Sequence, residues 1–175
     1  MTQPIIRAAT ADDIPAIAAI YRPAVMTGTA SFEIEPPSEE EMQRRFEAMT
    51  SGGFPYLVAE IDGVIAGYGY ANAYRPRPAY RFSVEDSIYI APGRQGQGVG
   101  RALLSELIRV STAKGFRQMI AVIGDSAQHA SIGLHRALGF TFVGTIHSVG
   151  YKHGRWLDSV LMQRALGSGD STPPG

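Results

Sequence analysis

The stretch RQGQGVGR at residues 94–101 restricts the folds open to this chain more than any other feature does. The apolar segment SIYIAPG precedes it and reads as a strand. An amphipathic helical pattern follows it, made of Val99, Leu103, Leu104, Leu107 and Ile108. A turn between a strand and a helix directs free backbone N–H groups and the positive end of the helix dipole at one point. The stretch therefore predicts a phosphate-binding loop.

The spacing of the glycines argues against two common nucleotide-binding motifs. A Walker A loop needs Gly-Lys-Ser/Thr after its glycines, and no such triplet follows Gly100. A dinucleotide fingerprint needs Gly-x-Gly-x-x-Gly after a first strand, whereas Gly-x-Gly-x-Gly follows the fourth predicted strand here. An ordinary glycine-rich turn stays open on spacing alone. Arg94 and Arg101 favour a pyrophosphate ligand, because guanidinium groups make charge-assisted contacts to phosphate.

The rest of the chain predicts an α/β fold with the element order β-α-α-β-β-β-α-β-α-β-β. We expect the first helix to start at Thr10 and to be broken by Pro23 and Gly28, and the second to start with a capping box of Ser38 and Glu41. This order predicts a mixed sheet with helices on both faces. A single domain is expected over residues 1–166, followed by a disordered tail over 167–175. The expected strands are 5–8, 56–61, 64–73, 84–90, 118–123, 141–149 and 156–163.

The composition of the chain argues against several kinds of binding partner and several kinds of site. Sixteen basic residues balance sixteen acidic ones, so we expect no nucleic acid and no membrane as a partner. The chain has no cysteine, which removes disulfides, a thiolate nucleophile and Cys-ligated metals. It also has no run of about 18 apolar residues. We expect a cytoplasmic globular protein that binds no metal.

Gln95, Gly98 and Gly100 match the Q/R-x-x-G-x-G/A signature of the GNAT superfamily of N-acetyltransferases, which the chain resembles over about residues 5–165. It is most similar to the branch of phosphinothricin and methionine sulfoximine N-acetyltransferases. The resemblance implies a mostly antiparallel sheet whose strands splay at a site for acetyl-coenzyme A. The matching segments are TASFE at 29–33, the Arg75-x-Arg77 loop, VEDSIYI at 84–90, AVIGDS at 121–126, LHRALGF at 134–140 and GYKHGRWLDSVLMQ at 150–163.

The resemblance also implies which residues hold the cofactor. Gln128 stands where the branch has an asparagine that contacts the cofactor, and Ser131 is retained three positions later. The longer amide of glutamine leaves open whether that contact shifts or is lost. Backbone groups of the strand before the loop would bind the pantetheine arm, and the loop itself would bind the pyrophosphate. These residues are Ile88, Tyr89 and Ile90, then Gln95, Gly96, Gln97, Gly98, Val99, Gly100 and Arg101.

Two residues are implied in catalysis. Glu85 matches the general base of the branch, although a carboxylate with an ordinary pKa of about 4.3 needs burial or favourable positioning to deprotonate an ammonium group. Its neighbour Asp86 points to the opposite face of the strand, so only one of the two serves as the base. His135 matches a histidine of the branch, at a position where the wider superfamily has a tyrosine that protonates the leaving thiolate. A packing histidine is the alternative.

Residues for the amine substrate are expected on loops. Arg75 and Arg77 match arginines that bind an anionic group in this branch, because a guanidinium fork fits a carboxylate or phosphinate. A solvated basic loop is the alternative. Phe32 and Tyr80 are expected to line the same pocket, together with Glu85. The branch is also matched at Lys152, His153 and Trp156. The resemblance implies that these residues lie near the cofactor or at an oligomer interface.

These observations predict an enzyme that acetylates the α-amine of a small amino-acid analogue with an anionic group. Acetyl-coenzyme A is the expected co-substrate, and transfer is expected to be direct in a ternary complex, since no cysteine can carry the acetyl group. The branch also implies a homodimer. Two alternatives stay open, a protein or peptide N-acetyltransferase and a non-catalytic acyl-coenzyme A sensor.

Overall fold

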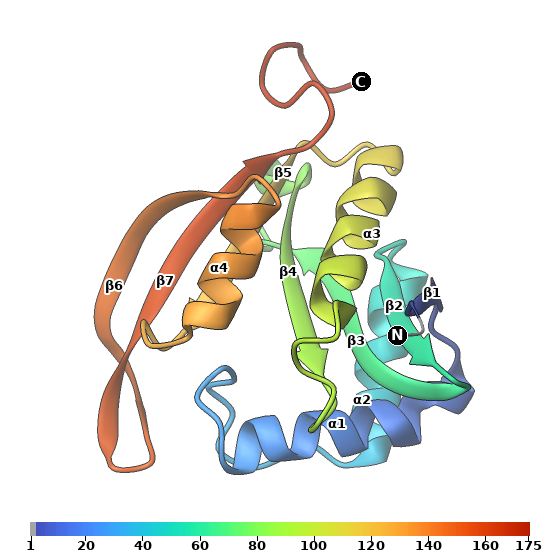
Figure 1. The fold of residues 1–175 in the computed structure, drawn as a ribbon. Helices are drawn as coiled ribbons and strands as arrows, with labels where there is room; N and C mark the ends of the chain where they lie inside the picture. Colours follow the sequence, from blue (N-terminus) through green and yellow to red (C-terminus); the bar gives the residue numbers. More distant parts are fainter. Residues whose placement is uncertain (1–2) are drawn as a thin grey trace.

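Seven strands form one sheet in the order β1-β2-β3-β4-β5-β7-β6 (Figure 1). The computed structural model describes residues 3–175. All neighbouring strands are antiparallel except β4 and β5, which are parallel. The predicted mixed, mostly antiparallel sheet is therefore confirmed. The strands are β1 (Ile5–Ala8), β2 (Tyr56–Ile61), β3 (Val64–Ala73), β4 (Ser83–Ile90), β5 (Gln118–Gly124), β6 (Thr141–Lys152) and β7 (Arg155–Ala165).

Helices cover both faces of the sheet, as predicted. One face carries α1 (Ile14–Met26) and α2 (Glu39–Ser51), and the other carries α3 (Val99–Ala113) and α4 (His129–Ala137). Short 3-10 turns, η1 (Ala11–Asp13) and η2 (Pro78–Tyr80), precede α1 and β4.

Alternation along the strands separates two hydrophobic cores. On β2, Tyr56 and Val58 pack with α1 and α2, whereas Leu57 and Ala59 pack with α3. The first core also contains stacked tyrosine rings, with Tyr68 5.3 Å from Tyr89 and 6.0 Å from Tyr56 between ring centroids. The sheet thus lies between two packed layers, and alternate side chains of β2 belong to different ones.

The first helix differs from its prediction at Pro23, which lies inside α1 rather than ending it. Proline lacks only its own N–H, so one hydrogen bond toward the helix start is lost. The carbonyl oxygen of Pro23 still accepts from the backbone N of Thr27 at 3.0 Å and from its Oγ1 at 2.9 Å. The start is closer to expectation, since the backbone N of Thr10 donates to Oδ2 of Asp13 at 2.8 Å.

After β7 the chain takes a series of turns beside the start of β5. The guanidinium of Arg117 donates to the carbonyl oxygens of Thr172 at 2.8 Å and Pro173 at 3.0 Å. The expectation of a disordered tail over 167–175 stays a prediction.

Gly67 on β3 sets how closely α3 approaches the sheet. A Cβ at this position would lie 2.9 Å from the carbonyl oxygen of Tyr89 and 3.0 Å from Cγ1 of Val99. We expect Gly67→Ala to lower the free energy of unfolding by about 1–3 kcal/mol, because backbone and helix must both shift. Denaturant unfolding followed by circular dichroism measures this change.

Gly133 on α4 is the matched control, since no atom lies within 4 Å of a Cβ built there. Gly133→Ala should raise the free energy of unfolding by about 0.5–1 kcal/mol, as alanine loses less backbone entropy in a helix. Equal effects of the two substitutions would contradict the close approach described for Gly67.

Candidate active site

The site begins where two neighbouring strands separate. β4 and β5 pair only between residues 83–86 and 118–121. Beyond this point β4 continues to Ile90 paired with β3 alone, and β5 continues to Gly124 paired with β7 alone. The facing edges of both strands are then free of ladder hydrogen bonds. This is the splay that the family resemblance implied.

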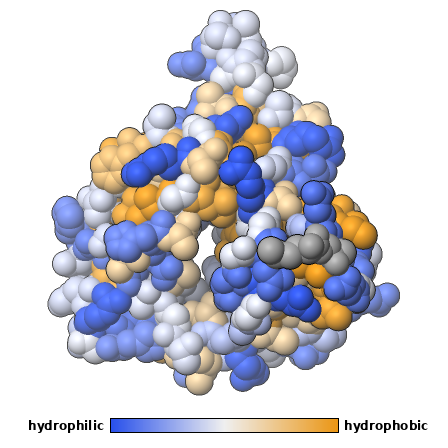
Figure 2. Space-filling model, viewed as in Figure 1, coloured by the Kyte–Doolittle hydropathy of each residue, from blue (hydrophilic) through white to orange (hydrophobic). Residues whose placement is uncertain are grey.

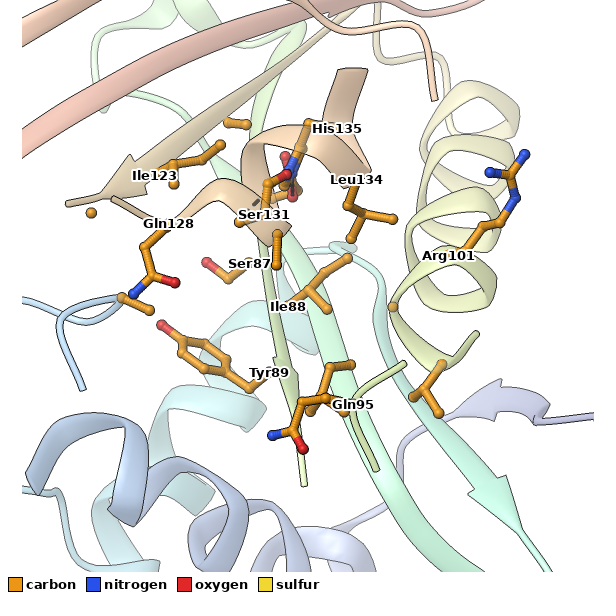
Figure 3. Close-up of a pocket in the computed structure, with 18 of the residues that line it drawn as sticks. Ser87, Ile88, Tyr89, Gln95, Arg101, Ile123, Gln128, Ser131, Leu134 and His135 are labelled. Atoms are coloured by element: carbon orange, nitrogen blue, oxygen red, sulfur yellow. Dashed lines mark hydrogen bonds and ion pairs between the residues drawn. The ribbon is translucent and has the colours of Figure 1, made fainter. Parts of the chain in front are cut away.

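A cavity of about 430 Å³ occupies the gap between the separated strands. The free end of β4 lines one side, and the end of β5 with the start of α4 lines the other (Figure 3). The glycine-rich loop and the first turn of α3 line a third side. Figure 2 shows the molecule hollowed in this region, with hydrophobic residues gathered above the opening.

Glycines shape the loop at the start of α3. Gly96 and Gly98 have φ angles of 74° and 80°, a region that residues with a Cβ rarely adopt. At Gly100 a Cβ would lie 3.2 Å from Cδ2 of Leu134, so glycine lets α3 and α4 close around the cavity. The first turn of a 15-residue helix thus borders the cavity, where its N–H groups favour an anion.

The structure brings together nearly all of the residues predicted for the cofactor. Gln97 is the one predicted cofactor residue outside the cavity lining, and its Nε2 donates to the carbonyl oxygen of Gly93 at 3.1 Å. Arg94 belongs to the lining as well. The predicted residues that line the cavity are Ile88, Tyr89, Ile90, Gln95, Gly96, Gly98, Val99, Gly100, Arg101, Gln128 and Ser131.

His135 and Asp86 form a buried pair on the cavity wall, with exposed fractions of 4% and 6%. Nε2 of His135 lies 2.9 Å from Oδ2 of Asp86, and Nδ1 lies 2.7 Å from the carbonyl oxygen of Ser131. A carbonyl oxygen can only accept, so Nδ1 carries a hydrogen and one further proton is shared between Nε2 and Asp86. Burial acts to lower the pKa of His135, but the hydrogen bond and charge of Asp86 outweigh it and raise that pKa.

The pair bears on the role expected for His135. Both ring nitrogens already have partners, so His135 can donate a proton to another group only by giving up one of these bonds. Oδ1 of Asp86 is buried and has no hydrogen-bond partner among residues 3–175. The sequence identified Asp86 only as the neighbour of Glu85. Strand alternation, which places the two side chains on opposite faces, was the one feature that could have placed Asp86 at the cavity.

Glu85 lies on the face of β4 opposite Asp86 and does not line the cavity. Its neighbours in register are Asn72 on β3 and Ile120 on β5. Burial raises the pKa of Glu85, the charge of Asp86 raises it further, and the charge of Arg75 opposes both. A carboxylate with a raised pKa is a stronger base, which is the property that the predicted role requires.

The other residues predicted for the substrate lie on loops outside the cavity lining. Arg75 and Arg77 are exposed just before and at the start of η2, and the Arg75 guanidinium carbon lies 5.2 Å from the ring centroid of Tyr74. That ring packs edge-on against Tyr80, with 5.6 Å between centroids. The structure therefore keeps Arg75 beside one aromatic pair, and neither arginine belongs to the lining of the cavity.

Phe32 lies on the α1–α2 loop, which we define as residues 27–38. Its ring packs against two glycines, since a Cβ would lie 2.8 Å from the ring at Gly124 and 2.5 Å from it at Gly150. The ring thus sits against the end of β5 and against β6, where any larger residue would displace it.

A polar network that the sequence did not reveal holds the α1–α2 loop. The hydroxyl of Tyr21 donates to Oε2 of Glu33 at 2.5 Å, and Nη2 of Arg45 donates to its Oε1 at 2.8 Å. Burial acts to raise the pKa of Glu33, but these donors outweigh it and keep that pKa below its ordinary value. Lys152 is only 4% exposed, and its Nζ donates to the carbonyl oxygen of Ser31 at 2.7 Å. Burial lowers the pKa of Lys152.

Comparison with known proteins identifies the family. The model of the acetyltransferase (GNAT) domain matches residues 6–161. The chain belongs to the GNAT acetyltransferase family. It is an N-acetyltransferase, as the sequence predicted.

Two curated relatives and one solved structure show the similarity. The phosphinothricin N-acetyltransferase of Alcaligenes faecalis is 56% identical over 169 residues, which are 97% of this chain and 86% of that protein. The L-methionine sulfoximine/L-methionine sulfone acetyltransferase of Pseudomonas paraeruginosa is 41% identical over 96% of this chain and 98% of its own. The crystal structure of a GNAT superfamily phosphinothricin acetyltransferase from Sinorhizobium meliloti, in complex with AcCoA, has a TM-score of 0.96 and 53% identity. The match covers 100% of this chain and 94% of the Sinorhizobium meliloti chain.

Residues 3–175 contain neither a helix suited to cross a membrane nor a cluster of metal-binding side chains. Among the helices of residues 3–175, none combines the length and the apolar character needed to span a membrane. Within the same residues, no three His, Cys, Asp or Glu side chains are grouped so that they could hold a metal ion.

The pairing of His135 with Asp86 predicts how His135 titrates. Asp86→Asn should lower the pKa of His135, because the negative charge that stabilises the imidazolium is removed. In an NMR titration of ¹⁵N-labelled protein, we expect the wild-type midpoint of His135 to lie above the ordinary value of 6.5 and the variant midpoint to fall below it.

The same shift predicts a stability effect with a definite sign. A histidine whose pKa is raised by folding stabilises the protein fully below its unfolded pKa and loses this contribution as pH rises through the folded pKa. Wild-type stability should therefore decline above about pH 6.5, and Asp86→Asn should lack this decline. A His135 midpoint that is unchanged in the variant would contradict the pair.

Proposed function

We propose that this enzyme transfers the acetyl group of acetyl-coenzyme A to the α-amine of a small amino-acid analogue of the phosphinothricin or methionine sulfoximine type. The observation that carries the proposal is the cavity between the separated ends of β4 and β5, bordered by the first turn of α3. The names of its relatives support the class of substrate, and the AcCoA complex of the Sinorhizobium meliloti protein supports the co-substrate.

The cavity fits acetyl-coenzyme A in two respects. Its glycine-rich end offers N–H groups at a helix start together with Arg94 and Arg101, which suit a pyrophosphate. Its long side offers the unpaired edge of β4 at Ile88, Tyr89 and Ile90, which suits a chain that contains amides. We assign the pyrophosphate to the first region and the pantetheine arm to the second.

Glu85 is the proposed general base. It would accept a proton from the substrate ammonium, directly or through a water molecule, and its raised pKa makes it suited to that task. The neutral amine then attacks the thioester carbonyl in a ternary complex, so that a C–N bond forms and the C–S bond breaks. His135 would supply the proton for the leaving sulfur from the position that it shares with Asp86.

Arg75 and Arg77 are proposed to bind the anionic group of the substrate, with Tyr80 and Phe32 beside it. Support comes from electrostatics, since the charge of Arg75 acts on Glu85 and lowers its pKa. The loop that carries both arginines therefore lies near the proposed base. An anion bound there would place the α-amine of an amino-acid analogue close to Glu85.

We also propose that the enzyme is a cytoplasmic homodimer. The hairpin of β6 and β7 lies at the edge of the sheet and exposes large apolar side chains, which a second copy of the chain would cover. Sedimentation equilibrium tests this point, with an expected mass of twice 18.8 kDa. A monomer at micromolar concentration would contradict it. The exposed side chains are Phe142, Val143, Ile146, Val149, Tyr151 and Trp156.

A thiol-release assay tests the proposed reaction. With acetyl-coenzyme A and a panel of amines, we expect phosphinothricin and methionine sulfoximine to be acetylated with the highest kcat/KM. Peptides with free N-termini or lysines should release little thiol. A preference for peptides would favour a protein acetyltransferase, and cofactor binding without thiol release for any amine would favour a sensor.

Glu85→Gln in the same assay tests the base. We expect kcat to fall by about 10²–10⁴, the range for loss of a general base, while the affinity for acetyl-coenzyme A stays the same. Wild-type kcat/KM should rise with pH through the raised pKa of Glu85, and the variant should lack that rise. Glu47→Gln, the same change on the exposed side of α2, is the matched control. Unchanged turnover by Glu85→Gln over about pH 6–9 would rule out this assignment.

A further inference from the structure

We propose that Gln128 fastens the α1–α2 loop to the cofactor cavity, so that binding of acetyl-coenzyme A and binding of the amine substrate strengthen each other. Gln128 acts here as a positioning residue, through Thr29. The inference rests on the proposed function, because it concerns the two substrates of that reaction.

The hydrogen bonds of Thr29 determine how the Gln128 amide is oriented. Oγ1 of Thr29 donates its hydrogen to Oδ2 of Asp125 at 2.8 Å, so it can only accept from Gln128. The partner at 3.2 Å is therefore the NH₂ end of the amide, Nε2. Asp125 is itself fixed, because it is buried and also accepts from Nη2 of Arg155 at 2.6 Å and from the backbone N of Ala127 at 3.0 Å.

The other end of the amide belongs to the cavity. Gln128 is the N-cap residue of α4 and lines the cavity. Figure 3 shows its side chain reaching from the start of α4 toward the hydroxyl groups of Ser87 and Tyr89. Its Oε1 makes no hydrogen bond to the part of the chain that the structure describes. This oxygen is available to accept an N–H of the pantetheine arm, and because an amide is planar, the bond to Thr29 holds it in place.

The α1–α2 loop in turn faces two ways. Ala30 lines the cofactor cavity, whereas Phe32, two residues later, does not. The ring of Phe32 packs against Gly124, which belongs to the lining, and against Gly150, which does not. Phe32 is also one of the residues proposed for the amine substrate. A shift of the loop at Thr29 therefore moves a wall of the cofactor site and a wall of the amine site together.

Other bonds hold the loop, but they come from elsewhere. Nζ of Lys152 donates to the carbonyl oxygen of Ser31, and Nε2 of His153 donates to that of Gly28 at 3.2 Å. Neither Lys152 nor His153 lines the cavity. Of the side chains that hydrogen-bond to residues 28–32 within the described chain, only Gln128 belongs to the lining as well. Ala30 touches the cavity through its own position on the loop, and Gln128 adds a hydrogen-bonded link from the cavity wall to Thr29.

The length of the side chain is what makes this link. Asparagine is shorter by one methylene, or about 1.5 Å. Its amide would draw back toward the start of α4, which still borders the cavity, and the 3.2 Å bond to Thr29 would lengthen beyond hydrogen-bonding distance. Gln128→Asn thus removes the bond to Thr29 while an amide group remains at the start of α4 beside the cavity.

Steady-state kinetics with methionine sulfoximine test the link. For Gln128→Asn we expect KM for the amine at saturating acetyl-coenzyme A to rise about two- to tenfold, the range for one neutral hydrogen bond. The Kd of acetyl-coenzyme A for the enzyme without amine should change less than about twofold, because the coupling acts only when both substrates are bound. Thr29→Val should raise the amine KM at least as much, and the double variant should be no worse than Thr29→Val alone, because one interaction is removed twice. Thr29→Ser keeps the hydroxyl and should retain wild-type values.

Gln43→Asn is the matched control, because it makes the same change on α2, away from both proposed sites, and should alter neither the amine KM nor this Kd. If the Kd of acetyl-coenzyme A for the enzyme without amine rose as much as the amine KM in Gln128→Asn, Gln128 would be a cofactor ligand only, and the proposal would be overturned. An unchanged amine KM would overturn it as well.

Hydrogen exchange gives a readout that does not depend on activity. Coenzyme A should slow amide exchange over residues 28–33 in the wild-type protein and have much less effect there in Gln128→Asn. The same slowing in both proteins would refute the link. If the wild-type enzyme acetylated no amine, the proposed function would fail, and exchange with coenzyme A would still decide whether Gln128 connects the cavity to the loop.

Discussion

The short parallel pairing between β4 and β5 is the constraint on which the rest of the structure depends. The two strands are hydrogen-bonded over residues 83–86 and 118–121 and then separate. Backbone N–H and C=O groups inside a protein need partners, so two free strand edges in the middle of a sheet form a site that a ligand rich in amides can complete. The start of α3 follows directly from β4 through the glycine loop, which places an anion-binding helix end beside the same gap.

The sheet also separates the two charged residues at the point where the strands part. Asp86 faces α4, where burial is compensated by His135, and the two share a proton. Glu85 faces the other side without such a partner, and burial raises its pKa. Adjacent residues on one strand thus acquire different chemistry because alternation exposes them to different layers. The side with the cofactor cavity holds a hydrogen-bonded pair, and the other side holds a carboxylate that has no ion-pair partner among residues 3–175.

The sequence predicted those features that depend on neighbours along the chain. The order of elements, the strand alternation at Glu85 and Asp86, and the loop at residues 94–101 are all local patterns, and they agree with the structure. Contacts between distant residues were missed, because no single sequence shows them. Asp86 and His135 are 49 residues apart, and Ser31 and Lys152 are 121 apart. Pro23 was misplaced for a different reason. A proline removes the hydrogen bond of its own N–H, but its carbonyl oxygen still accepts from Thr27, and α1 continues to Met26. The roles of the arginine loop remain predictions.

Gly124 on β5 and Gly150 on β6 determine where the ring of Phe32 can lie, and Phe32 is one of the residues proposed for the amine substrate. Both leave room for the ring of Phe32, and a methyl group at either would press on that ring. At Gly124 the added Cβ would also lie 2.8 Å from the carbonyl oxygen of Thr29 and 3.0 Å from that of Ala30, so the α1–α2 loop would have to move with the ring. With Phe32 beside the amine as proposed, the range of amines could change through Gly150, which lies outside the cofactor cavity, and through Gly124, which lines that cavity. In evolution or in engineering, substitutions at these two glycines would change the shape of a pocket whose own side chains stay the same.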